Sequence, residues 1–118
     1  MNERERKVQE RIMKITRKYG SYTYKNAQNM YTEKGRPDLT ACVPVPISEL
    51  RKLFGDDGVV GVFVGIEVKR DGLLGNVSEA QKIVGEQIKK AKGLWFAVDN
   101  SDFVEGLMLR LTGNKDGV

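Results

Sequence analysis

Three charged side chains fall at the ends of two predicted strands. Asp38 opens one strand directly after Pro37, whereas Glu67 and Lys69 close the other, in the segment GIEVKRD. The two-residue period of a strand places Glu67 and Lys69 on one face, together with Gly65. Burying a carboxylate and an ammonium costs several kcal/mol per ion unless each has a partner. The two side chains therefore either form an ordinary ion pair or serve a site at the end of the strand.

An antiparallel arrangement of these two strands predicts a metal site. The start of one strand would then lie beside the end of the other, so that Asp38, Glu67 and Lys69 meet at one sheet edge. Two close carboxylates repel each other unless a cation lies between them, and Mg²⁺ or Mn²⁺ binds such oxygen ligands. The backbone carbonyl of Val68 adds a further ligand. Lys69 would orient an attacking water or neutralise charge in the transition state, as phosphodiester hydrolysis requires.

The composition excludes several other chemistries. The 118 residues include no histidine and only one cysteine, Cys42, which excludes a histidine base, histidine- or Cys₄-ligated zinc and an internal disulfide. The net charge of +4 permits a nucleic-acid partner, although solvated helix faces explain it equally well. No apolar run is long enough to span a membrane, and the first residues have no signal-peptide core, so we expect a cytoplasmic protein.

Hydrophobic periodicity predicts helices and strands in the order α-β-β-(short α)-β-α-β-α. Asn2, Ser78 and Ser101 are the expected helix N-caps, and SEAQ is a capping box in which Gln81 reaches back to Ser78. In the helix over 79–92, we expect Ala80, Ile83, Val84, Ile88 and Ala91 to face inward. The predicted helices are 3–19, a short one within 47–58, 79–92 and 101–111, and the predicted strands are 21–25, 38–45, 59–69 and 94–99.

These elements predict a single α/β domain over 1–118, with a mixed sheet of about four strands flanked by helices. The unit 59–98 demands a right-handed parallel crossover, whereas the two earlier strands can pair antiparallel. Residues 45–60 form an insertion longer than a minimal hairpin, which could cover the site, contact DNA or form part of a dimer face. The tail 112–118 should be flexible.

The motifs resemble a known nuclease family. GRPDLTACV followed by FVGIEVKRD is similar to the PD-(D/E)XK motif, with Pro37-Asp38 as the PD half and Glu67-Val68-Lys69 as the ExK half. The first helix, YGSYTYK, G-x-PD, ExK and the later SEAQ together resemble the VRR-NUC branch, which phages often encode and which is related to Holliday-junction resolvases. The resemblance spans about residues 5 to 105 and implies a restriction-endonuclease-like core.

The resemblance also implies roles for individual residues. Asp38 and Glu67 would bind the metal, Lys69 would be catalytic, and Gln81 would lie in the active site, although its capping role explains Gln81 as well. The family also places an acid on the first helix, but this sequence has Gln9 at that position. We expect Glu10 to replace it, with Glu5 as the alternative.

The implied function is a Mg²⁺- or Mn²⁺-dependent DNA endonuclease specific for branched or flapped duplexes, acting as a homodimer with a possible helicase or recombination partner. Lys25, Arg36 and Arg70 are candidate DNA contacts, although Lys25 is equally well explained as an exposed strand lysine. The alternative is a catalytically weak or inactive module on a nuclease scaffold that binds nucleic acid or protein. RNA as the substrate also remains open.

Overall fold

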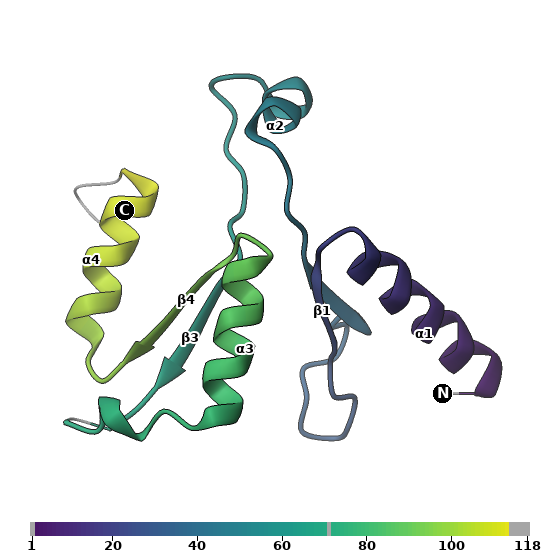
Figure 1. Ribbon diagram of the computed structural model, residues 1–118, viewed down its shortest axis with the longest axis horizontal. Helices are drawn as coiled ribbons and strands as arrows, with labels where there is room; N and C mark the ends of the chain where they lie inside the picture. The colour runs from purple at the N-terminus through teal and green to yellow at the C-terminus, as the bar shows by residue number, and fades with distance from the viewer. Residues whose placement is uncertain (1, 71, 114–118) are drawn as a thin grey trace.

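The computed structural model describes residues 2–70 and 72–113 as a mixed α/β chain (Figure 1). The predicted order of helices and strands is confirmed, with most boundaries within three residues. Residues 114–118 of the predicted tail lie outside the described part, whereas Thr112 still belongs to the last helix. The elements are α1 (Glu3–Lys18), β1 (Tyr22–Lys25), β2 (Leu39–Cys42), α2 (Ile47–Phe54), β3 (Val64–Val68), a 3₁₀ turn (Leu74–Asn76), α3 (Glu79–Lys90), β4 (Leu94–Val98) and α4 (Ser101–Thr112).

The described strands form two separate sheets of two strands each. β1 and β2 pair antiparallel, from Tyr22 opposite Cys42 to Lys25 opposite Leu39. β3 and β4 pair parallel, as predicted, and α3 connects them. The four predicted strands are therefore present, but within the described residues they form two sheets and not one mixed sheet, because β2 and β3 do not pair.

The sequence between β2 and β3 explains the separation. Pro44 lies two residues after β2 and Pro46 caps α2, and a proline has no N–H to donate to a neighbouring strand. The predicted strand 59–69 begins only at Val64, because residues 59–63 are irregular. Figure 1 shows these two connectors running up to α2 and back, with the two sheets diverging below them.

Side-chain caps fix the starts of three helices. Asn2 accepts a hydrogen bond from the Glu5 N–H, and Ser78 and Gln81 form the complete capping box, so both predictions are confirmed. The third predicted cap, Ser101, is wrong. The N-cap of α4 is Asn100, whose side chain accepts a hydrogen bond from the Phe103 N–H at 3.0 Å. None of the described helices has the length and apolarity needed to cross a membrane.

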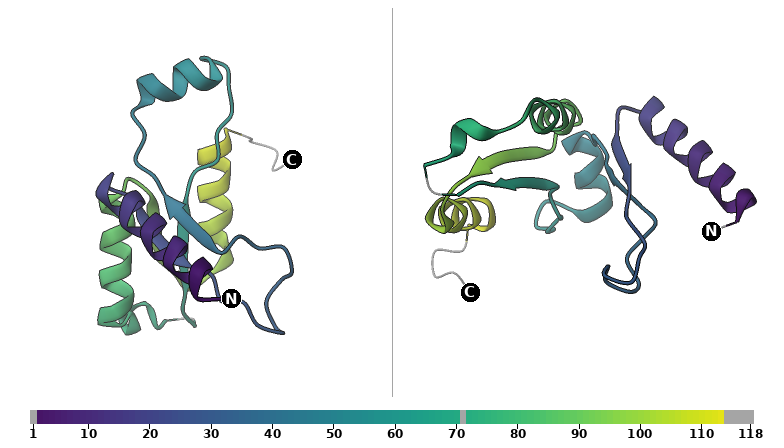
Figure 2. Two further views of the ribbon diagram at one scale, coloured as in Figure 1. Left: turned by 90° about the vertical axis from the view of Figure 1, so that its right-hand side faces the viewer. Right: turned by 90° about the horizontal axis from the view of Figure 1, so that it is seen from below.

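The β3–β4 sheet lies between two helices, with α3 on one face and α4 on the other (Figure 2). Ile88 and Ala91 of α3 are buried as predicted, but Ala80, Ile83 and Val84 are exposed. A sheet of only two strands is too narrow to cover them. The stripe that faces the sheet instead runs through Gln81, Gly85 and Ile88.

α1 packs on β1 through a similarly narrow stripe. Gln9 and Met13 are buried, and the Thr16 hydroxyl lies 2.8 Å from that of Thr23. The apolar residues that predicted the helix remain largely exposed, namely Val8, Ile12, Ile15 and Tyr19. The radius of gyration is 17.0 Å, whereas a compact domain of this length should have one of about 13.5 Å. The fold is therefore open.

Candidate active site

Glu67, Lys69 and Gln81 come together at the C-terminal end of β3. The Lys69 ammonium lies 3.6 Å from Glu67 Oε1, and the Gln81 side-chain amide donates a hydrogen bond to the same oxygen. Both charged side chains are largely buried, with 18% of Lys69 and 30% of Glu67 exposed. This exposure is far below that of the other ion pairs among the described residues, in which every side chain is at least half exposed.

Two local features place these side chains. The alternation along β3 turns Gly65 and Glu67 toward α3, and the missing side chain of Gly65 leaves room for Ile88 and Trp95, which lie 3.1 Å from where its Cβ would be. The capping box then fixes Gln81, whose Oε1 accepts from the Ser78 N–H at 2.9 Å. The free amide of Gln81 therefore points at Glu67.

The Glu67 carboxylate is the type of oxygen ligand that a hard cation such as Mg²⁺ prefers, but the site has too few such ligands to hold one. Lys69 and Gln81 both approach Oε1 of Glu67, and no donor from the described residues reaches Oε2. Val68, the expected carbonyl ligand, ends β3 opposite Val98. Across residues 2–70 and 72–113, however, no three His, Cys, Asp or Glu side chains gather closely enough to hold a metal ion. The second carboxylate is missing from this arrangement.

Asp38 lies in the other sheet, directly before β2, and its side chain is exposed. The loop that leads to it is held by Asn26, whose side-chain amide donates to the Pro37 carbonyl at 2.9 Å and to the Thr40 hydroxyl at 2.7 Å. Asn26 is not among the residues predicted from the sequence. Its only signal is an amide residue at the start of a polar loop, where asparagine commonly bonds to the backbone.

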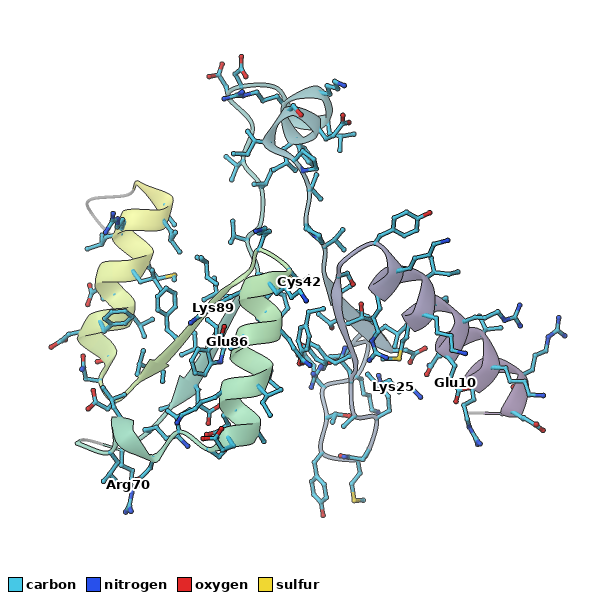
Figure 3. The ribbon with its side chains drawn as sticks, viewed as in Figure 1. Glu10, Lys25, Cys42, Arg70, Glu86 and Lys89 are labelled. Carbon is cyan, nitrogen blue, oxygen red and sulfur yellow. The ribbon has the colours of Figure 1, made fainter. Side chains whose placement is uncertain are left out.

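The structure does not bring the predicted helix acid to this cluster. Glu10 is exposed on α1, on the opposite side of the molecule from Arg70 (Figure 3). The alternative, Glu5, is also exposed and bonds to its own N-cap, Asn2. Gln9, which occupies the family position of the acid, is instead the residue that α1 buries against the hairpin.

The candidate DNA contacts divide between the two sheets. Lys25 ends β1 opposite Leu39, and Arg36 donates to the Asn26 side chain at 3.1 Å, so both lie near Asp38. Arg70 is exposed just after β3, near Lys69. Positive side chains therefore accompany both halves of the predicted site.

The two sheets touch at one end, through Cys42. Its thiol lies 3.6 Å from the Ala91 carbonyl of the α3 C-cap, and burial raises the pKa of this thiol, while a hydrogen bond with the Gly93 backbone opposes the shift. A Cβ on Gly93 would lie 2.8 Å from the Cys42 sulfur and 3.3 Å from the Phe63 ring. Tyr22, the strand partner of Cys42, also packs edge-on against Phe63. Cys42 and Phe63 therefore both lie beside Gly93.

Comparison of the chain with protein-family models, with curated proteins and with solved structures finds no significant match.

Proposed function

We propose that the protein is a divalent-metal-dependent DNA endonuclease with a restriction-endonuclease-like core. The observation that carries this proposal is the largely buried cluster of Glu67, Lys69 and Gln81 at the end of β3. Glu67 Oε2 is available to bind a metal ion, and the Lys69 ammonium lies beside the same carboxylate. A metal-dependent phosphodiesterase needs both features and a second carboxylate. The resemblance of Pro37-Asp38 and Glu67-Val68-Lys69 to the PD-(D/E)XK motif names the second carboxylate, Asp38.

The contact at Cys42 supports a register in which Asp38 would reach Glu67. β2 ends at Cys42 and β3 begins just after Phe63, so the two strands would pair antiparallel if they paired from this contact. Asp38 lies four residues before Cys42, and Glu67 lies four residues after Phe63. If the free edges of β2 and β3 pair in this register, Asp38 lies opposite Glu67 with both side chains on the face that carries Cys42 and Gly65. Since Cys42 and Gly65 both face α3, the carboxylates would lie beneath Gln81.

The residues of the closed sheet then have distinct tasks. Asp38, Glu67 and the carbonyl of Val68 would hold Mg²⁺ or Mn²⁺, which supplies a Lewis acid and lowers the pKa of a bound water. Lys69 neutralises charge on the phosphoryl group, and Gln81 fixes the orientation of Glu67. Lys25, Arg36 and Arg70 contact the phosphate backbone and position the duplex.

The substrate follows from the resemblance and not from the site geometry. Branched or flapped duplex DNA is the expected substrate, a homodimer the expected form, and a helicase or recombination protein the expected partner. A single small domain offers little surface for grasping a junction, which favours two copies acting together.

The alternative is an inactive nuclease scaffold that binds nucleic acid or protein. Two observations favour it: Gln9 replaces the helix acid, and no three potential metal ligands gather within the described residues. Metal binding separates the two functions. Calorimetry should detect Mn²⁺ binding to the nuclease and its loss in the Asp38→Asn, Glu67→Gln double variant, whereas the inactive scaffold would bind no Mn²⁺ in either form.

A cleavage assay tests the proposed activity. Four-way junction, flap, linear duplex, single-stranded DNA and a matched RNA are incubated with the protein, with and without Mg²⁺ or Mn²⁺. We expect metal-dependent cutting of branched DNA by the wild type and a loss of about 100-fold or more in Lys69→Ala, with DNA binding retained. Lys82→Ala is the matched control, since Lys82 forms an exposed pair with Glu79. If Lys69→Ala cuts as fast as the wild type, the role of Lys69 is wrong.

A further inference from the structure

We propose that residues 43–63 form an arm that joins two copies of this chain. The arm consists of α2 and the two connectors that link it to β2 and β3, and it stands out from the rest of the molecule (Figure 1). α2 has no buried residue. This inference assigns an interface to the homodimer of the proposed function, and it holds whether or not the chain cuts DNA.

The apolar side chains of α2 lie on one face. Ile47, Leu50, Leu53 and Phe54 follow the spacing of a single helical stripe, and Ile47 and Leu53 are 67% and 70% exposed. The opposite face carries Ser48 and Lys52, and Lys52 pairs with Glu49 at 3.1 Å. The polar face of α2 is therefore suited to water. On its apolar face Leu50 is half-buried, whereas Ile47, Leu53 and Phe54 remain largely exposed.

The base of the same arm offers a place for this apolar face. A hollow of about 420 Å³ lies between α2 and the two connectors, with walls that include Val43, Val45, Val60 and Val62. The tip of the arm, with Leu53 and Phe54, thus carries apolar side chains, and its base carries an apolar hollow. When the complementary parts lie on one element, two identical arms can exchange them across a twofold axis, and the assembly closes as a dimer.

The exposed area is large enough for such a dimer. The chain exposes 9604 Å², whereas a compact monomer of this mass should expose about 6,400 Å². A standard interface removes about 800 Å² from each partner. Pairing of β2 with β3 would take up part of the excess, but it would not cover α2, which projects beyond both sheets (Figures 1 and 2).

The charge of the arm favours a second copy over other occupants. Residues 43–63 carry three acidic and two basic side chains, so the arm has no positive excess. A phosphate backbone or an anionic membrane surface would require one. Two nearly neutral arms do not repel each other.

Sedimentation of the full chain tests the arm. We expect the wild type to sediment at twice the chain mass of 13.3 kDa and the Leu53→Glu, Phe54→Glu variant at the chain mass itself. Ser48→Glu, which adds a negative charge on the opposite face of α2, should remain dimeric. A monomeric wild type at about 100 μM, a concentration at which interfaces of standard size are populated, would overturn the proposal, as would a double variant that stays dimeric.

Hydrogen exchange on the unmutated chain covers the case in which the double variant fails to fold. The amides of Ile47–Phe54 should be protected at high protein concentration and lose protection on dilution, while those of α3 stay protected. Equal exchange in α2 at both concentrations would contradict the arm interface. Protection of α2 that appears only after DNA or anionic vesicles are added would assign the arm to that partner instead and overturn the proposal.

Discussion

Gln81 combines two tasks at the scale of a single residue. Its carbonyl oxygen closes the capping box of α3, and its amide donates to Glu67. The first task can be read from the four letters SEAQ, because the box is a local motif. The second needs β3 and α3 to be packed together, and only the resemblance to the nuclease family indicated it.

Gln81→Glu separates these two tasks. The new carboxylate still accepts from the Ser78 N–H but cannot donate to Glu67, and it adds a second negative charge beside it. We expect a loss of about 1–3 kcal/mol in the free energy of unfolding at neutral pH without metal. A cation between the two carboxylates would relieve the repulsion, so Mn²⁺ should raise the melting temperature of Gln81→Glu more than that of the wild type.

Gln87→Glu is the matched control for this experiment, because it makes the same change at an exposed position of α3. Thermal unfolding with and without Mn²⁺ measures both variants. Equal stabilisation of the two by Mn²⁺ would mean that the cation does not bind beside Glu67.

At the scale of elements, the contact of α3 with β4 depends on Gly85. A Cβ at this position would lie 2.7 Å from the ring of Trp95, which is closer than real carbon atoms approach. The ring of Trp95 packs under α3, with the Lys89 ammonium 5.6 Å from the ring centroid. The sequence alone does not indicate this role of Gly85, because a glycine inside a helix suggests only reduced helix stability.

Gly85→Ala should destabilise the protein by about 1–3 kcal/mol, because the added methyl group forces Trp95 to shift. Gly106→Ala in α4 is the matched control. A Cβ there meets no atom within 4 Å, so the better helix propensity of alanine should stabilise the protein by about 0.5–1 kcal/mol. Urea unfolding followed by circular dichroism measures both changes. Stabilisation by both substitutions would show that Trp95 does not pack against Gly85.

The errors in the predicted elements have a common physical cause. Caps and periodicity are local, so α1, α3 and the parallel β3–β4 unit could be predicted from the sequence. Which apolar residues are buried depends on what covers them, and Ile12 and Ile83 stay exposed because the sheets beside them are narrow. The cap at Asn100 was missed because Asn100 and Ser101 are adjacent and both suit the position.

At the scale of the whole molecule, the candidate site depends on one relation between the two sheets. The sequence predicts candidate residues for both halves, but whether β2 pairs with β3 depends on the connectors and α2, whose path no local pattern determines. Cys42 at the end of β2 contacts the Ala91 carbonyl beside the second sheet, so antiparallel pairing of the free edges of β2 and β3 from this contact would add hydrogen bonds in a fixed register. If Cys42 is opposite Phe63, as in the register proposed above, Ala41 lies opposite Val64 once β2 and β3 pair.

A disulfide between these two positions tests the closed sheet. In a Cys42→Ala background, Ala41→Cys with Val64→Cys should form an intrachain disulfide under mild oxidation, and the oxidised form should bind Mn²⁺ more tightly than the reduced form because Asp38 is then held beside Glu67. Ala41→Cys with Ile66→Cys is the control, since diagonal neighbours lie about 7–8 Å apart, beyond the usual reach of a disulfide. Non-reducing electrophoresis separates intrachain from interchain products. If the control pair links as readily as the test pair, or the test pair links only between chains, the β2–β3 register is wrong and Asp38 does not join Glu67 within one chain.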